Sequence, residues 1–186
     1  MEKVTKEELL KLNKKDLLGK IIVFPTDTVY GVGCLYLDSV GREKIYEMKK
    51  RDHNKNLPIL LSKIEDAKKL AYIDEAHIKY TKHWPGALTL IFKANDKDYI
   101  HDTIALRMPN SSIALDILNH FGPMEVTSVN ISGEKELSSV KEIEDEFKEY
   151  IDYLVIDDAI FSKVSSTVLS LVNEPIVLRQ GEIVIK

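Results

Sequence analysis

The sequence contains a single cysteine, Cys34, among its 186 residues. One cysteine excludes an internal disulfide and a cysteine cluster for zinc, and a lone thiol with apolar neighbours is expected to be a buried side chain rather than a nucleophile. No apolar run approaches the roughly 20 residues that span a bilayer, and the charged segment 1–16 lacks the hydrophobic region of a signal peptide. We therefore expect a cytoplasmic protein with no membrane segment.

Common catalytic and metal-binding patterns are missing as well. The chain has no Gly-x-Ser-x-Gly elbow and no Walker-type glycine loop, so the usual designs for covalent catalysis and phosphate cradling are unsupported. The five histidines are scattered, and the nearest pair, His77 and His83, lies six positions apart, which suits one helix face poorly. The sequence thus predicts no metal site built from protein ligands.

The composition is that of an ordinary globular protein, with 44% hydrophobic and 30% charged residues. A length of 186 residues fits one domain, and the sequence shows no internal repeat, linker or low-complexity segment. We therefore expect residues 1–186 to form a single domain.

The net charge of -4 hides an uneven distribution of charge. Residues 42–55 contain six cations against three anions, whereas residues 134–158 contain ten acids against three lysines. A compact basic patch on an acidic chain suits a small anionic ligand such as a nucleotide better than a broad nucleic-acid surface.

Hydrophobic patterning predicts an α/β fold in which helices flank a mixed sheet. Asp38 and Ser39 are expected to cap a helix through about residue 50, with Val40, Ile45 and Met48 on one face. The other predicted helices lie within 1–16, within 64–84 with an interruption near Asp74, at 111–122 and at 140–150. The predicted strands are 21–24, 57–61, 87–94, 103–108, 153–157, 166–172, 175–179 and 182–186, and a further strand is expected before residue 127.

Polar side chains follow several of these strands, at the positions where α/β sheets usually bind ligands. Thr26, Asp27, Thr28 and Tyr30 follow the first strand, and the threonine hydroxyls suit either turn chemistry or a ligand. Arg107 lies in an apolar strand and needs a carboxylate partner, either internal or from a ligand. The segment 49–55 is rich in cations, which the helix dipole also favours at the end of a helix. The other polar groups are the segments 127–133 and 165–167 and Arg179. Gly31 and Gly33 are expected to permit a tight turn or close packing.

The order of several uncommon sequence motifs is more specific evidence of function than any one of these polar groups. "FPTDTVYGVG" is followed by Lys49-x-Arg51, "WPGALTLIF", "TIALRMPN", Ser128-x-Asn130-x-Ser132-Gly133, "SSTV" and "LRQG". From about residue 20 to residue 181, this order resembles the YrdC family, known as threonylcarbamoyl-AMP synthases.

The resemblance implies a single-domain, twisted mixed α/β sheet whose concave, positively charged side holds the substrates. It also implies a nucleotidyltransferase that converts L-threonine, bicarbonate and ATP to L-threonylcarbamoyladenylate and pyrophosphate. Mg²⁺ would be held mainly by the phosphates. Partner enzymes would then transfer the threonylcarbamoyl group to the adenosine beside the anticodon of tRNA. No protein nucleophile is needed, because the threonine carbamate itself attacks the α-phosphate.

The resemblance also assigns roles to residues of this chain. The K-x-R and S-x-N signatures place Lys49, Arg51, Ser128 and Asn130 at the catalytic centre, where Lys49 is expected to add positive charge for the phosphates. The residues expected to contact ATP are Arg51, Lys55, Thr103, Ser128 and Arg179. Those expected to hold threonine are Thr28, Arg107 at the α-carboxylate, Val126 through its main chain, and Ser166. The chain departs from the pattern at Asp52, Leu60 and Glu136, and the last two replace side chains with which some relatives contact substrate.

Two alternatives stay open on the sequence. The first is a non-catalytic module that binds double-stranded RNA or tRNA, against which the small basic patch lacks interleaved aromatic residues. Weak tRNA contact could also accompany catalysis. The second is carbamoyl-adenylate chemistry, which usually belongs to much longer chains with additional domains. The short form of the family, without a second domain after residue 186, is expected.

Overall fold

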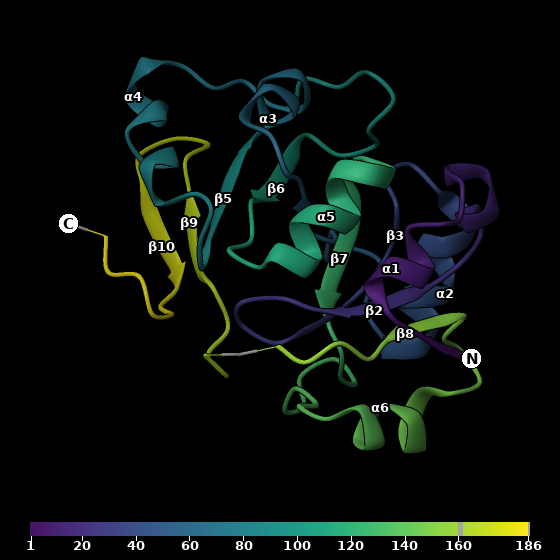
Figure 1. Cartoon of the computed structure of the whole chain (residues 1–186). Coiled ribbons are helices and arrows are strands. Elements are labelled where there is room, and N and C mark those ends of the chain that lie inside the picture. Colours follow the sequence, from purple (N-terminus) through teal and green to yellow (C-terminus); the bar gives the residue numbers. More distant parts are fainter. Residues whose placement is uncertain (160–161, 186) are drawn as a thin grey trace.

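The computed structural model describes residues 1–159 and 162–185. Within these residues the strands form one ten-stranded sheet in the order β1-β8-β2-β3-β7-β4-β6-β5-β9-β10 (Figure 1). Four neighbouring pairs are parallel and five are antiparallel, so the mixed sheet expected from the sequence is confirmed. The strands are β1 (Glu2–Val4), β2 (Ile22–Pro25), β3 (Tyr30–Leu35), β4 (Ile59–Leu60), β5 (Leu88–Lys93), β6 (Thr103–Arg107), β7 (Met124–Ser128), β8 (Tyr153–Val155), β9 (Thr167–Ser170) and β10 (Ile176–Arg179).

The helices largely follow the predicted caps. Asp38 caps α2 by accepting a hydrogen bond from the Gly41 amide, and Ser111 caps α5, which ends at Gly122. No helix within the described residues is long and apolar enough to cross a membrane. The α-helices are α1 (Lys6–Leu9), α2 (Ser39–Lys49), α3 (Ile64–Leu70), α4 (Glu75–Ile78), α5 (Ser112–Phe121) and α6 (Val140–Phe147), and the 3-10 helices are η1 (Lys14–Leu17) and η2 (Thr81–His83).

Alternation along β2 divides the core between the two faces of the sheet. Ile22 and Phe24 pack with α1 and α5 on one face, whereas Ile21 and Val23 pack with α2 and α6 on the other. A third apolar cluster lies between α3 and strands β4, β5 and β6. Helices therefore cover both faces, and the ends of the central strands remain free to form a site (Figure 1).

Three local predictions were wrong. The segment 1–16 forms β1, a short α1 and the start of η1 rather than one helix, because Glu2 to Val4 pair with β8. Val40 is 58% exposed and does not share the buried face of Ile45 and Met48. Residues 182–185 form no strand, and Lys186 lies outside the described residues.

Gly31 and Gly33 lie inside β3 rather than at a turn, and they allow the neighbouring β7 to approach closely. A Cβ atom on Gly33 would meet the backbone oxygen of Glu125 at 2.8 Å and a methyl group of Val126 at 2.7 Å. On Gly31 it would meet only the other methyl group of Val126 at such a distance, also 2.7 Å. The side chain of Val126 thus occupies the space that both glycines leave.

We expect Gly33→Ala to lower the free energy of unfolding by about 1–3 kcal/mol, because a backbone carbonyl cannot move aside without disturbing the β3–β7 pairing. Gly31→Ala should cost less, because its close neighbour is a side-chain methyl group. Denaturant unfolding of the two variants measures the difference. Equal stability of Gly33→Ala and the wild type would contradict this account of the packing.

Candidate functional site

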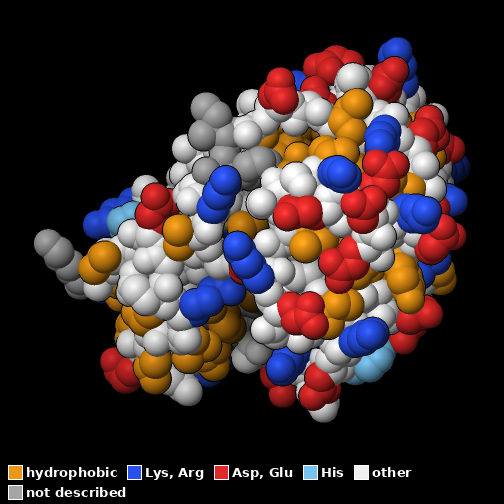
Figure 2. Space-filling view, turned by 90° about the horizontal axis from the view of Figure 1, so that it is seen from below, with side chains coloured by type: hydrophobic (Ala, Val, Ile, Leu, Met, Phe, Trp, Pro, Cys, Tyr) orange, Lys and Arg blue, Asp and Glu red, His pale blue; other side chains and the backbone are white. Residues whose placement is uncertain are grey.

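A cavity of about 470 Å³ lies where the ends of β2, β6 and β7 meet β9 and β10. Figure 2 shows Lys and Arg side chains gathered along the hollow between a smaller part of the molecule and the larger remainder. Nine of the eleven predicted site residues line the cavity, whereas Lys55 and Thr103 do not. The nine are Thr28, Lys49, Arg51, Arg107, Val126, Ser128, Asn130, Ser166 and Arg179.

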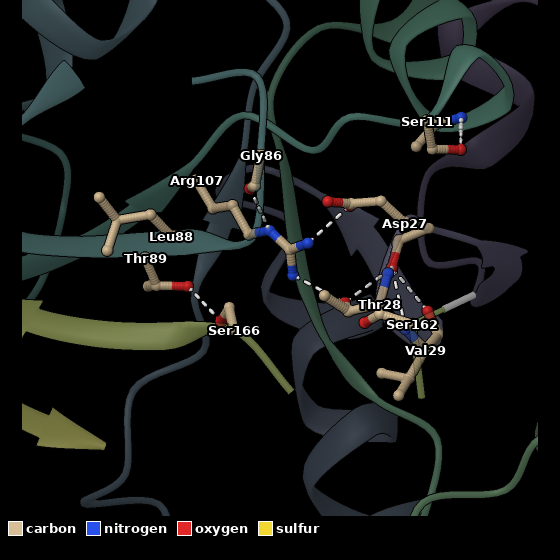
Figure 3. Close-up of polar contacts among 12 residues, drawn as sticks. Asp27, Thr28, Val29, Gly86, Leu88, Thr89, Arg107, Ser111, Ser162 and Ser166 are labelled. Carbon is tan, nitrogen blue, oxygen red and sulfur yellow. Dashed lines mark hydrogen bonds and ion pairs between the residues drawn. The ribbon is translucent and has the colours of Figure 1, made fainter. Parts of the chain in front are cut away.

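Arg107, at the end of β6, is held by three residues from two parts of the chain (Figure 3). Its Nη2 donates to Asp27 Oδ1 at 2.6 Å, its Nη1 donates to Thr28 Oγ1 at 2.9 Å, and its Nε donates to the Gly86 oxygen at 3.1 Å. A guanidinium has five N–H groups, so one remains on each terminal nitrogen. Arg107 is thus oriented by the protein and still has donors for a carboxylate.

The two threonines after β2 have different roles. Thr26 Oγ1 donates to the Val29 oxygen at 2.6 Å and accepts from the amides of Thr28 and Val29, so it closes the turn. Thr28 Oγ1 instead accepts from Arg107 and lies 3.1 Å from Thr26 Oγ1. Turn chemistry therefore accounts for Thr26, whereas Thr28 belongs with the guanidinium of Arg107.

Ser166, which precedes β9, connects two further groups of the cavity wall. Its hydroxyl lies 2.8 Å from Thr89 Oγ1, and Arg179 donates to its Oγ at 3.1 Å and to its backbone oxygen at 2.9 Å. In Figure 3 the Thr89–Ser166 pair lies on the opposite side of the Arg107 guanidinium from Asp27. Hydroxyl groups and a guanidinium thus share this end of the cavity, a combination that suits hydrogen bonding to a small carboxylate.

Lys49, the last residue of α2, is 1% exposed and points inward to the end of β7. Its Nζ donates to the oxygens of Ser128 at 2.5 Å and Asn130 at 2.8 Å, and to Asn130 Oδ1 at 2.9 Å. Asn130 Oδ1 also accepts from Ser128 Oγ at 2.7 Å. An ammonium has three N–H groups, and here all three bind the protein. Lys49 therefore fixes the positions of Ser128 and Asn130.

Comparison with known proteins decides the family. The family model Sua5/YciO/YrdC, described as telomere recombination, matches residues 17–181. The chain belongs to the Sua5/YciO/YrdC family. It is 32% identical to a putative threonylcarbamoyl-AMP synthase of Methanocaldococcus jannaschii, over 97% of this chain and 89% of that protein. It is 33% identical to the threonylcarbamoyl-AMP synthase of Pyrococcus abyssi, over 88% of this chain.

The fold of the chain is also that of solved Sua5/YciO/YrdC structures. A structure of Pyrococcus abyssi Sua5 complexed with L-threonine matches 95% of this chain with a TM-score of 0.85 and 31% identity. This chain covers 54% of that structure and 51% of the corresponding sequence, so it spans about half the length of the Pyrococcus relative. The resemblance to this family drawn from the sequence is confirmed.

Charges in this Sua5/YciO/YrdC cleft are unevenly compensated. Four cations and two acids, Glu134 and Glu136, line the cavity. Burial lowers the pKa of Lys49 to about 8, with the neighbouring charge of Arg51 acting in the same direction. Burial also lowers the pKa of Arg107, and Asp27 opposes this effect. The cleft thus concentrates desolvated positive charge, which favours anionic ligands.

Arg51 lies beside the loop that follows α2. Its Nε donates to the Lys55 oxygen and its Nη2 donates to the Asn56 oxygen, both at 2.9 Å. Lys55 therefore contributes its backbone to the orientation of Arg51, and its side chain is exposed. The side-chain amide of Asn56 donates to the backbone oxygen of Thr103 at 3.4 Å. Thr103 is therefore linked to the cavity wall only indirectly.

Asp27 and Thr89 are members of this arrangement to which the sequence assigned no role. The sequence placed Asp27 among the polar residues after the first strand and indicated a carboxylate partner for Arg107, but it did not pair these two residues, which lie 80 positions apart. Thr89 carried no comparable signal, because it reads as one polar residue of an alternating strand. Its contact with Ser166 depends on the parallel pairing of β5 with β9.

Proposed function

We propose that the protein is an L-threonylcarbamoyladenylate synthase, a nucleotidyltransferase that forms threonylcarbamoyl-AMP and pyrophosphate from L-threonine, bicarbonate and ATP. The observation that carries this proposal is the oriented group formed by Arg107, Thr28 and Ser166 in a cleft that also contains Arg51 and Arg179. A relative of the same fold is known in complex with L-threonine, and the relatives named above are a threonylcarbamoyl-AMP synthase and a putative one.

In this proposal, Arg107 binds the α-carboxylate of threonine through its two remaining N–H groups, and the hydroxyls of Thr28 and Ser166 complete the subsite. The α-amine reacts with bicarbonate to give a carbamate and water. An oxygen of the carbamate attacks the α-phosphorus of ATP, and the bond from that phosphorus to the bridging oxygen breaks as pyrophosphate leaves. The protein contributes orientation and charge rather than a nucleophile.

We place the triphosphate beside Arg51 and Arg179, whose donors meet the charge of the leaving pyrophosphate. Lys49 holds Ser128 and Asn130 in place. Among the described residues no group of three or more His, Cys, Asp or Glu side chains lies in a position to hold a metal ion. We therefore propose that Mg²⁺ enters with ATP and is bound mainly by phosphate oxygens and water, where it neutralises phosphate charge.

The product would pass to tRNA threonylcarbamoyl-transferring enzymes of the cytoplasm, because a mixed carbamic–phosphoric anhydride hydrolyses unless it is used. Direct binding of tRNA or double-stranded RNA as the main function receives less support. Of the four cations that line the cavity, Lys49 and Arg107 are buried, and the cavity has the size of a small-molecule site rather than of a broad basic surface.

Pyrophosphate release should require ATP, bicarbonate and L-threonine together, and mass spectrometry should detect threonylcarbamoyl-AMP in the mixture. Carbamoyl phosphate in place of bicarbonate and threonine should give no release. Equal release with carbamoyl phosphate would instead indicate carbamoyl-adenylate chemistry. If no substrate mixture supports turnover and tRNA binds equally well to the wild type and to Arg51→Ala, the RNA-binding function would replace the proposal.

A further inference from the structure

Glu136 and Ser165 connect two segments of the cavity wall that are far apart in the sequence. Glu136 belongs to the loop that follows β7, and Ser165 belongs to the segment 162–166 that leads into β9. Ser165 Oγ donates to Glu136 Oε1 at 2.6 Å, and both residues line the cavity. This hydrogen bond lowers the pKa of Glu136, and the charges of Arg179 and Lys49 act in the same direction. Glu136 is therefore an ionised acceptor, and such hydrogen bonds are stronger than neutral ones.

The segment 162–166 is tied to the cleft at several points. The amide of Ser162 donates to the Asp27 oxygen and the amide of Lys163 donates to the Thr28 oxygen, both at 3.0 Å. Lys163 adopts a φ of 58°, a conformation that costs a non-glycine residue about 1–2 kcal/mol. An unfavourable backbone conformation persists only where contacts hold it. The Ser165–Glu136 hydrogen bond is such a contact. Ser165 is also the residue immediately before Ser166.

We propose that Glu136 is a positioning residue that, through Ser165, fixes the segment 162–166 and thereby sets Ser166 in the threonine subsite. This inference rests on the proposed function, because it names Ser166 as a threonine contact. Glu136 itself need not touch either substrate. Its carboxylate accepts the hydrogen bond from Ser165 and so holds the loop after β7 and the segment 162–166 together.

A double-mutant cycle tests the proposal in the assay for threonine-dependent pyrophosphate release. Glu136→Ala and Ser165→Ala should each raise the KM for threonine about tenfold, the effect of one lost charge-assisted hydrogen bond. The double variant should do no more than either single one, because both remove the same contact. Ser165→Thr retains a hydroxyl and should restore most of the affinity. In Ser165→Ala, kcat and the KM for ATP should stay near the wild-type values.

A matched control uses the Ser139–Glu142 pair, in which Ser139 Oγ donates to Glu142 Oε2 at 2.9 Å at the exposed start of α6. Removing this pair should leave the KM for threonine unchanged. Independent effects of Glu136→Ala and Ser165→Ala, or an unchanged KM for threonine in Ser165→Ala, would overturn the inference while the proposed function stands.

Hydrogen exchange provides a readout that needs no turnover. In Glu136→Ala and Ser165→Ala, the amides of Ser162 and Lys163 should exchange about tenfold faster than in the wild type, because the segment opens more easily. Unchanged protection of both amides would overturn the positioning role even if the wild type makes no threonylcarbamoyl-AMP. Faster exchange without any threonine-dependent turnover would instead contradict the proposed function and support the link from Glu136 through Ser165 to the segment 162–166.

Discussion

Replacement of Arg107 by alanine should raise the KM for threonine by one to two orders of magnitude and leave the KM for ATP nearly unchanged. The variant loses the guanidinium that Asp27, Thr28 and Gly86 orient toward the cavity. A charge-assisted hydrogen bond contributes about 1.5–3 kcal/mol, and each 1.4 kcal/mol is about tenfold in affinity. Pyrophosphate release at varied threonine and at varied ATP separates the two effects.

Stability must be separated from binding in this experiment, because Arg107→Ala leaves the partly buried Asp27 without its cation. The double variant Arg107→Ala/Asp27→Asn removes that charge and should recover stability without recovering threonine affinity. Arg42→Ala is a matched control, since Arg42 forms a comparable pair with the buried Glu125 and does not line the cavity. An unchanged KM for threonine in Arg107→Ala would remove Arg107 from the threonine subsite.

The sequence predicted those parts of the fold that depend on local signals. The cap residues Asp38 and Ser111 mark the starts of α2 and α5 because their side chains bind amides only three positions away. The segment 1–16 was mispredicted because its pairing partner, β8, lies about 150 positions later, and a helical pattern carries no information about that contact. β3 was missed for the same reason, since its glycines read as a turn until β7 is packed against them.

The sequence predicted which residue types form the site better than it predicted the contacts between them. Hydroxyls and cations at strand ends were singled out from the sequence, and the family resemblance selected among them. The direction of each side chain was not available, because it depends on partners far away in the chain. Lys49 was interpreted as extra positive charge for the phosphates, but its three donors are directed to Ser128 and Asn130.

That arrangement gives Lys49→Met a large expected effect on both folding and catalysis. The substitution leaves three buried oxygen acceptors without the ammonium, so we expect the free energy of unfolding to fall by about 3 kcal/mol. Because Ser128 and Asn130 then lose their fixed positions, kcat should fall about 100-fold, the scale of loss that follows a displacement of about 1 Å in a catalytic group. Lys50→Met, which alters the exposed neighbouring cation, should change neither quantity much.

The form of the kinetic defect distinguishes positioning from direct phosphate binding. A positioning role lowers kcat, whereas a lysine that binds the phosphates of ATP in the ground state would mainly raise the KM for ATP. Burial lowers the pKa of Lys49 to about 8, so the wild-type kcat/KM should fall as the pH rises through about 8, when the ammonium loses a proton and one of its three hydrogen bonds. Residual activity of Lys49→Met should lack this decline. If the variant keeps both the wild-type kcat and the decline, Lys49 does not position Ser128 and Asn130 for catalysis.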